Sequence, residues 1–498
     1  MFSKPAASRW VTLIVVIAAF LPVVVDMTIL HIAIPSLTVA VRATATEILW
    51  IIDIYPLLMA GLLVPMGTLG DRIGYRTMML TGLWVFGIAS VFAAFAPTAQ
   101  ALIAARALLA VGGSMIMPSV LALVRQTFED EDERARALGI WTIVGSAGGA
   151  VGPLAGGILL EHFWWGAVFL VNVPIMLIVL PLNYMLLPRT PGRSSVEWKI
   201  GHALILIAGL IATVYAIKSS VKADGAIALS LLMLAAGIGL LVWFARLQIR
   251  SANPMLDLTL FRNTAISAGL LMAFVASGAM AGFELVLAQE LQYVFGKTPL
   301  EAGIFMLPLV VAAAISGPVA GILVGKIGLR SLSVSGLIVA GASLGIIAIT
   351  DVQADPILTA VLLAVFGFAV GSALLASSVA IMGGASAEMA GAAGSLESTG
   401  YELGAALGIA FFGVMLGSIY QSSFSLAGLP PSSAAASSIG EAMVAAGAMG
   451  TVQGAAVIAA AKEAFSNAHT FVVGTASVLI IGIGMAVWVM LRARQEEA

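Results

Sequence analysis

The stretch GTLGDRIGYR at residues 67–76 decides how this chain is interpreted, because the sequence uses its pattern twice. The second copy, GILVGKIGLR, occupies residues 321–330 and keeps the glycines and the final arginine. Each copy ends one long apolar run, turns at a glycine and enters the next run. A repeat spaced at about half the chain indicates duplicated helical bundles, an arrangement typical of secondary transporters. Asp71 of the first copy is Gly325 in the second, so the turn is duplicated but its charges are not.

The composition places this repeat in a membrane protein. Of the 498 residues, 61% are hydrophobic and 10% are charged, and the mean hydropathy is +1.08. A soluble core cannot bury that much apolar surface, so the bilayer must act as the solvent. The net charge of −2 argues against a nucleic-acid partner, and the absence of cysteine excludes disulfides, thiolate metal sites and a thiol nucleophile. The four scattered histidines form no metal-binding pattern, and we expect no cofactor.

Fourteen apolar runs are long enough to cross the hydrocarbon core, which takes about 20 helical residues. The expected spans are 10–33, 47–69, 76–96, 99–123, 136–160, 165–187, 200–217, 226–245, 264–290, 302–324, 331–350, 357–382, 395–420 and 470–492. The first run is too long for a signal sequence and should remain as a spanning helix. The repeated turn follows spans 2 and 10, so spans 1–6 correspond to spans 9–14 and spans 7 and 8 form an additional pair.

We therefore predict an all-α polytopic membrane protein with three parts. Residues 1–190 form a six-helix bundle, residues 191–262 form two additional helices, and residues 263–498 form a second six-helix bundle. Placing both termini in the cytoplasm leaves few cations outside, as the positive-inside rule requires. The external Lys and Arg residues are then Arg42, Lys218, Lys222, Lys297 and Lys462.

A long external segment at residues 421–469 separates the last two spans. It is rich in alanine and serine, contains Pro430 and Pro431, and has a helix-like run from about residue 438 to 465. The helical run predicts a lid or hairpin, whereas the composition equally suits a plain loop.

Asp26 lies within span 1, in VVVDMTILHIAIP. A carboxylate at this depth costs on the order of 3 kcal/mol on insertion scales, so it should face a cavity or a partner. Burial favours the neutral acid and a bound cation favours the charged form, so one carboxylate can hold either a proton or a cationic substrate. The alternative interpretation is a hydrogen-bonded structural acid.

Three further carboxylates lie within spans 2, 9 and 13, and these are Asp53, Glu284 and Glu402. Glu402 should sit deep enough to face a cavity, whereas a water-exposed position near the outer surface explains Asp53 and Glu284 equally well. Arg106 in span 4 is the only basic residue deep in an expected span, and it needs a carboxylate or carbonyl partner. The excess of acids over cations at depth favours a cationic substrate.

Glycines form a second pattern in span 5, within GGAVGPLAGG. Gly148, Gly152 and Gly156 recur every four residues and should line one helix face, which permits close helix contact. Pro153 frees a backbone carbonyl and can kink the helix beside Gly157. We expect a bendable gate contact between the two bundles, although small-residue packing alone would also explain the pattern.

The first copy of the repeated turn carries charges that suit a cytoplasmic gate. Gly67, Asp71, Arg72, Gly74 and Arg76 lie at the cytoplasmic ends of spans 2 and 3. Ion pairs there could lock the inward side and break when the bundles rock. Positive-inside anchoring alone would explain the arginines but not Asp71.

These motifs resemble those of the major facilitator superfamily, and the resemblance covers essentially the whole chain. Residues 67–76 resemble its loop 2–3 signature, LIAARALLAVGGS around Arg106 resembles the span-4 signature, and GGAVGPLAGG resembles the antiporter signature. With fourteen spans and D-x-T-x-x-x-x-A-x-P from Asp26 to Pro35, the chain is similar to the drug:proton antiporter-2 family. WIIDIYPLLMAG and YELG, which starts at Tyr401, are similar to quaternary-ammonium and methyl-viologen exporters.

The resemblance implies proton-driven export of lipophilic cations from the bacterial cytoplasm, across the inner membrane, by alternating access. Quaternary ammonium antiseptics, methyl viologen and cationic dyes would be substrates, and the partners would be these cations, protons and lipid. It implies that Asp26 is the proton- or substrate-binding acid, with Arg106 and Glu402 also expected in proton coupling. We expect the substrate to bind at Asp26, Asp53, Glu284, Tyr401 and Glu402. A monomer is expected.

Departures from the family pattern affect the substrate range. His31 replaces the usual asparagine, and Tyr75 replaces a frequent basic residue. Export of another metabolite, such as an amino acid or a siderophore, is therefore the alternative on the same scaffold. A membrane-embedded enzyme would need a nucleophile–base pair or a metal cluster, which the spans lack. A non-transporting receptor is disfavoured by the deep acids and the internal repeat.

Overall fold

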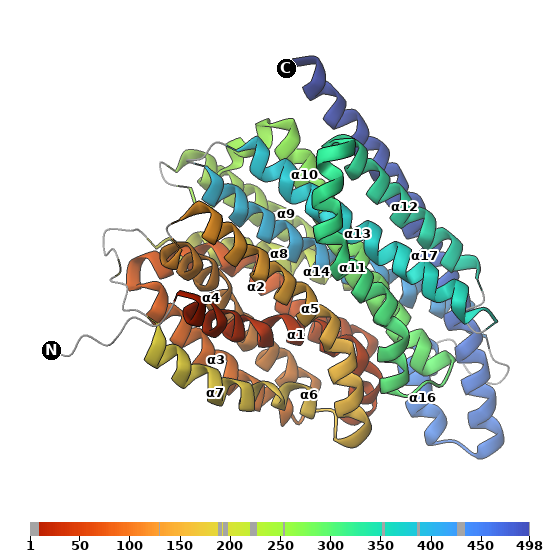
Figure 1. Cartoon of the computed structure of the whole chain (residues 1–498). Helices are drawn as coiled ribbons and strands as arrows, with labels where there is room; N and C mark the ends of the chain where they lie inside the picture. Colours follow the sequence, from red (N-terminus) through yellow and green to blue (C-terminus); the bar gives the residue numbers. More distant parts are fainter. Residues whose placement is uncertain are drawn as a thin grey trace.

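The computed structural model describes residues 9–128, 130–187, 192, 198–219, 227–251, 254–350, 354–385, 389–425 and 434–497, and the regular structure in them is helical (Figure 1). In chain order the elements are α1 (Arg9–Val41), α2 (Ala45–Ile73), α3 (Tyr75–Ala94), α4 (Ala99–Thr127), α5 (Glu131–His162), α6 (Ala167–Leu170), α7 (Asn172–Leu186), α8 (Ile200–Ser219), α9 (Ile227–Arg250), the 3₁₀ helix η1 (Leu258–Arg262), α10 (Thr264–Gln289), the π-helical turn η2 (Glu290–Val294), α11 (Pro299–Ile327), α12 (Leu329–Ile349), α13 (Pro356–Gly384), α14 (Ala390–Ser423), α15 (Ala434–Ser437), α16 (Ile439–Gly447) and α17 (Thr451–Glu497).

The predicted all-α membrane fold is confirmed. Within the described part of the chain, 13 helices are long and apolar enough to cross a membrane, with α6 and α7 together forming one of them. The helix α5 has 32 residues and occupies the place of the predicted fifth span. The orientation with both termini in the cytoplasm stays a prediction from the charge pattern.

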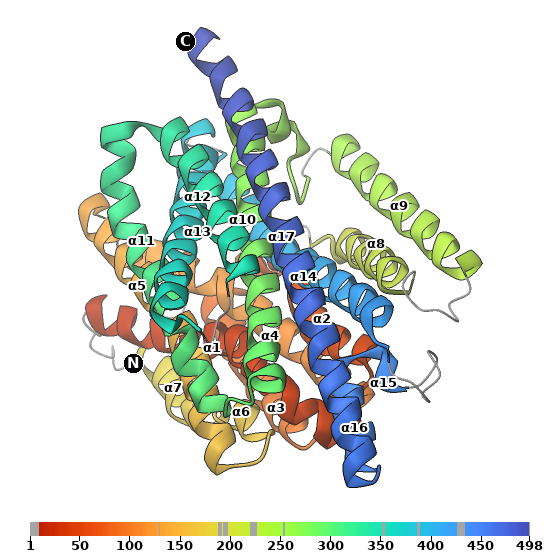
Figure 2. The same cartoon turned by 90° about the vertical axis from the view of Figure 1, so that its right-hand side faces the viewer.

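The helices assemble as two bundles with an additional pair at their side. Helices α1 to α7 pack on one another, and α10 to α14 pack with α17, as the red-to-yellow and green-to-blue ribbons show in Figure 1. Each bundle has its own buried apolar core. Contacts between the bundles are made mainly by α2 with α14 and by α5 with α11. The pair α8 and α9 lies at the edge of the molecule, where α8 touches both α2 and α14 (Figure 2).

The duplicated turn has the same backbone in both copies. Gly74 ends α2 at φ 91°, and Gly328 ends α11 at φ 81°, so both occupy a region that favours glycine. The Gly74 amide donates to the Gly70 carbonyl at 2.9 Å, and the Gly328 amide donates to the matching Val324 carbonyl at 3.1 Å. Gly67 lies one turn earlier on α2 and faces α4. The repeat in sequence is therefore a repeat in structure.

The same two helices also begin alike. Thr44 and Glu47 form a capping box at the start of α2, with each side chain bonding the other's backbone amide. Thr298 and Glu301 form the corresponding capping box at the start of α11, in the register of the glycine turn. Such a box satisfies amides that a helix N-terminus leaves unpaired. Because both ends match, α2 and α11 are corresponding helices of two duplicated halves.

The predicted external segment contains helices that extend the last span. Helix α17 has 47 residues, which at 1.5 Å per residue is about 70 Å and more than twice the hydrocarbon thickness. It runs the full height of the molecule in Figure 2, and α16 packs back against its first turns as a hairpin. Glu441 of α16 accepts a hydrogen bond from the Ala45 amide of α2 at 3.0 Å. Pro430 and Pro431 lie outside the described residues.

Candidate functional site

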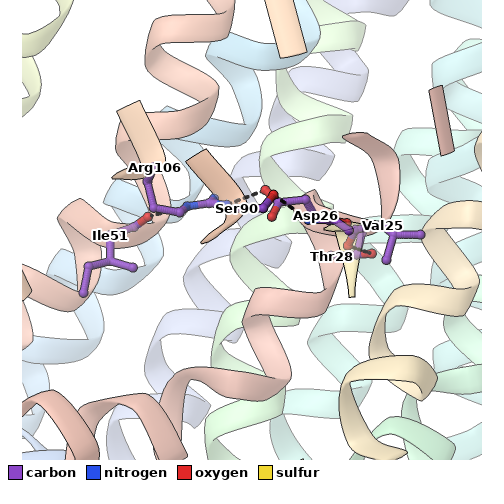
Figure 3. A network of polar contacts seen from close by, with 7 residues as sticks. Val25, Asp26, Thr28, Ile51, Ser90 and Arg106 are labelled. Carbon is purple, nitrogen blue, oxygen red and sulfur yellow. Dashed lines mark hydrogen bonds and ion pairs between the residues drawn. The ribbon is translucent and has the colours of Figure 1, made fainter. Parts of the chain in front are cut away.

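Asp26 and Arg106 form a buried pair in the first bundle (Figure 3). Arg106 Nη1 donates to Asp26 Oδ2 at 2.5 Å, and each residue is only 1% exposed. Arg106 Nε donates to the Ile51 carbonyl at 3.0 Å, and its guanidinium lies 4.7 Å from the centre of the Tyr55 ring. One side chain of α4 therefore holds a carboxylate of α1 and a turn of α2 in a fixed arrangement. Sequence analysis predicted that Arg106 needs such a partner but could not identify it.

The second carboxylate oxygen of Asp26 could accept a proton or bind a cation. Among the described residues, Asp26 Oδ1 has no hydrogen-bond partner, although the Asn172 side chain lies beside the carboxylate and donates to Ser90 at 3.3 Å. A buried carboxylate oxygen without a donor is costly unless it binds a proton or a cation. Sequence analysis missed Asn172, because a neutral amide within the expected span 165–187 carries no charge that would mark it.

Glu402 is a buried acid of the second bundle. It is 4% exposed on α14, and its Oε2 has no hydrogen-bond partner in the part of the chain that the structure describes. Tyr55 of α2 lies within electrostatic range of both Asp26 and Glu402, so the two acids approach the same ring from opposite bundles. This arrangement provides two buried protonatable groups, one in each bundle, that both influence one ring of α2.

Tyr401, the neighbour of Glu402, is directed elsewhere. Its hydroxyl donates to Glu397 Oε1 at 2.6 Å and lies 3.2 Å from the Ser377 hydroxyl of α13. Ser277 of α10 donates to the Tyr401 carbonyl at 2.9 Å. Tyr401 thus ties α10, α13 and α14 together, and a role in substrate contact stays a prediction.

Asp53 is paired with a cation that sequence analysis placed in an external loop. Lys218 Nζ lies 2.6 Å from Asp53 Oδ2, donates to the Leu49 carbonyl at 3.0 Å and sits 4.2 Å from the centre of the Trp50 ring. Asp53 is 0% exposed and Lys218 is 4% exposed. Lys218, in the last turn of α8, is therefore a second buried cation beside Arg106. Lys218 escaped notice because it follows an apolar run and was assigned to the loop beyond it.

Glu284 pairs with the residue that departs from the family motif. Its Oε2 lies 3.3 Å from His31 Nδ1, and both side chains are buried, so the water-exposed position considered for Glu284 is wrong. The contact joins α1 to α10 across the two bundles. Eight residues after Glu284, Gln292 donates to the Ile32 carbonyl at 3.0 Å. These contacts join the halves at the end predicted to be external.

The glycine pattern of α5 lies against both bundles. The face at four-residue spacing packs on α1 and consists of Gly148, Gly152 and Gly156. On another face, a Cβ added to Gly157 would lie 2.7 Å from Leu300 Cα, and one added to Gly303 would lie 2.6 Å from the Pro153 carbonyl oxygen. Backbones of α5 and α11 therefore touch across the halves, at the same end as the contact between His31 and Glu284. A role of this contact in gating stays a prediction.

The charged turn after α2 is arranged differently from the expected lock. Asp71 Oδ1 accepts a hydrogen bond from the Tyr75 hydroxyl at 2.8 Å, and Arg76 donates to the Tyr184 carbonyl at 2.5 Å. Arg72 is exposed. Within the described residues no ion pair joins Asp71 to either arginine, so a gate role for this turn also stays a prediction. The described His, Asp and Glu residues include no group of three or more that could hold a metal ion.

Comparisons with known proteins agree on one family. Residues 16–409 match the Major Facilitator Superfamily. The chain is 44% identical over 490 residues to the methyl viologen resistance protein SmvA of Salmonella typhimurium, covering 98% of this chain and 99% of that protein. It is 36% identical over 499 residues to the multidrug efflux pump LfrA of Mycolicibacterium smegmatis, covering 98% of both. A solved bacterial homologue of the human lysosomal transporter Spinster, in an inward-facing and unoccupied conformation, superposes with a TM-score of 0.70 at 17% identity and 98% coverage of both chains.

Proposed function

The chain belongs to the major facilitator superfamily, and on that basis we propose that it is a proton-coupled efflux antiporter for lipophilic cations. It is a transporter rather than an enzyme, and a multi-pass protein of the bacterial cytoplasmic membrane. The names of its relatives, a methyl viologen resistance protein and a multidrug efflux pump, support cationic and chemically varied cargo.

The observation that carries the proposal is the half-satisfied carboxylate of Asp26. Arg106 holds one oxygen, while the other makes no hydrogen bond among the described residues and has the Asn172 amide beside it. The arginine favours the charged acid and burial favours the neutral acid, so the balance is sensitive to a proton or to a cation that arrives at the free oxygen. Competition between the two at one carboxylate is the minimum chemistry that exchange requires.

In the proposed cycle, a lipophilic cation from the cytoplasm binds beside deprotonated Asp26, with the Tyr55 ring offering a face for its charge. Glu402 provides a second acid on the opposite bundle, which suits dications such as methyl viologen. Opening on the external side releases the cation, and protonation of the acid returns the carrier. Alternating access would use the contacts of α2 with α14 and of α5 with α11, which must separate on one side and form on the other.

The test uses inverted membrane vesicles with an imposed proton gradient and a fluorescent lipophilic cation. Adding the cation should release protons in vesicles with the parent protein, and Asp26→Asn should abolish the release while the protein stays folded. Glu161→Gln, at an exposed acid of α5, should leave exchange unchanged. Exchange retained by Asp26→Asn would move coupling to Glu402 or Asp53. No proton movement with any cation would reject the drug-antiporter proposal and favour export of another metabolite.

A further inference from the structure

The turn of α2 that holds Lys218 has the chemistry of an organic-cation site. Within five residues it presents the Asp53 carboxylate, the Leu49 carbonyl and the face of Trp50, and all three contact one ammonium group. Carboxylates, carbonyls and aromatic faces are the groups by which proteins recognise alkylammonium ions. Here the ammonium belongs to the chain itself and comes from the additional helix α8.

We propose that Asp53 and Trp50 form an exit site for the exported cation, and that Lys218 is a tethered competitor that displaces the cation from it. The inference rests on the proposed function, since it assigns a step in cation release. Lys218 then acts as a residue that sets affinity and release rate at this site, beyond its contribution to folding.

The position of the site supports a role in release. Leu49 packs against Gly413 of α14, so Asp53 lies beside the contact that joins the two bundles at the predicted external end. Helix α8 touches both α2 and α14. Release to the outside requires α2 and α14 to separate at this end, and that separation would bring Asp53 and Trp50 to the opening. Closure would return Lys218 to its observed place.

The duplicated half offers a comparison within the chain. In the register set by the two capping boxes and the two glycine turns, Asp53 of α2 corresponds to Leu307 of α11. A leucine therefore suffices at this depth for a helix of this kind to fold and pack. The acid of α2 needs another explanation, and its partner comes from α8, one of the two helices that lie between the halves in sequence.

A lysine suits a competitor better than an arginine does. Its ammonium is a compact charge on a flexible stem, and it makes fewer fixed hydrogen bonds than a guanidinium. Tethering gives it an effective concentration on the order of millimolar, so it can take back the carboxylate from a bound substrate without being lost. It also keeps Asp53 neutralised whenever the external side is sealed, which avoids a buried unpaired charge.

The test measures tetraphenylphosphonium affinity of the purified full-length protein together with its efflux rate in vesicles. Lys218→Met removes the competitor and keeps the length of the side chain. It should bind the cation about tenfold more tightly than the parent and export it more slowly, because a tethered competitor at millimolar effective concentration is gone. The double variant Asp53→Asn/Lys218→Met should return to within about twofold of the parent affinity. Lys297→Met, at a lysine that lies 5.5 Å from the Phe305 ring, is the matched control and should change neither value.

If Lys218→Met does not fold, Lys218→Arg provides a second test of the inference. A guanidinium should compete more strongly, so this variant should bind tetraphenylphosphonium more weakly than the parent. Equal or weaker binding by folded Lys218→Met, or equal or tighter binding by Lys218→Arg, would overturn the inference and leave Lys218 as a structural counter-ion. A parent protein that neither binds nor exports any lipophilic cation would instead reject the proposed function itself.

Discussion

Two buried ion pairs lie against α2 and differ in the parts of the molecule that they join. Asp26 pairs with Arg106 and Asp53 pairs with Lys218, and in both cases the cation also donates to a carbonyl of α2 and lies over an aromatic ring of α2. The first pair lies wholly within one bundle. The second joins that bundle to the additional helix α8, beside the contact between the bundles.

The chemistry of the two cations fits their places. The guanidinium of Arg106 is permanently charged and its fork binds the Asp26 carboxylate and a carbonyl at once, so it keeps α1, α2 and α4 in one arrangement. The ammonium of Lys218 is a point charge on a flexible chain that can leave and return. On the proposed mechanism, a buried pair within one bundle serves as a frame, whereas a similar pair beside a contact that must open can be exchanged.

The largest effect is expected from Arg106→Ala. Removing the guanidinium leaves Asp26 buried without its partner, which costs about 3–5 kcal/mol in comparable pairs. The variant should unfold at a lower temperature than the parent in detergent and should show no cation-driven proton release in vesicles. Arg262→Ala, at an exposed arginine, is the control and should change neither measurement. Parental stability in Arg106→Ala would contradict the view of this pair as a frame.

Arg106→Lys tests whether the pair with Asp26 needs a guanidinium or only a positive charge. The charge is kept, but one ammonium cannot reproduce the two-armed contact with Asp26 and the Ile51 carbonyl. We expect about a tenfold loss of exchange rate, equivalent to roughly 1.4 kcal/mol, with a smaller loss of stability than in Arg106→Ala. Stopped-flow measurement of proton release gives the rate. Full activity would mean that charge alone is required at this position.

Gly303→Ala should expose the surroundings of the Asp53 pair but not those of the Asp26 pair, because it disturbs the contact between α5 and α11. The added Cβ would lie 2.6 Å from the Pro153 carbonyl oxygen, an overpacking that typically costs about 1–3 kcal/mol and here should weaken the contact between the bundles at the predicted external end. The chain has no cysteine, so a cysteine introduced at Leu49 reports on the Asp53 side and one at Ser90 reports on the Asp26 side. Labelling by a membrane-impermeant maleimide should rise at position 49 and stay low at position 90.

The control for this experiment is Gly317→Ala on the same helix, because a Cβ at Gly317 would meet nothing within 4 Å. It should leave labelling at position 49 unchanged. Equal increases at positions 49 and 90 in Gly303→Ala would indicate general loosening of the fold and would remove the distinction between the pairs.

The sequence predicted the membrane helices well because hydrophobic length is a local property. It missed the true start of α17 at Thr451, since hydropathy detects the part of a helix in lipid and not its continuation in an alanine-rich external segment. At the site, sequence motifs identified Asp26 and Arg106. They did not identify Lys218 as the partner of Asp53 or His31 as the partner of Glu284, because these pairs join helices far apart in sequence. The charge of Asp53 is therefore balanced by Lys218, a residue that a span-by-span count assigns to a loop.

The smallest expected effects come from the two aromatic faces. Trp50→Leu removes the ring beneath the Lys218 ammonium, and Tyr55→Leu removes the ring beside Arg106. Each cation–π contact at a desolvated site is worth about 1–2 kcal/mol. The coupling of Trp50 to Lys218, measured by a double-mutant cycle of unfolding free energies with Lys218→Met, should be about 1 kcal/mol.

In addition, Trp50→Leu should weaken tetraphenylphosphonium binding in the Lys218→Met background, where the site is free for the external cation. If the ring stabilises the lysine but contributes nothing to cation binding once the lysine is gone, then the turn of α2 anchors α8 and does not receive substrate.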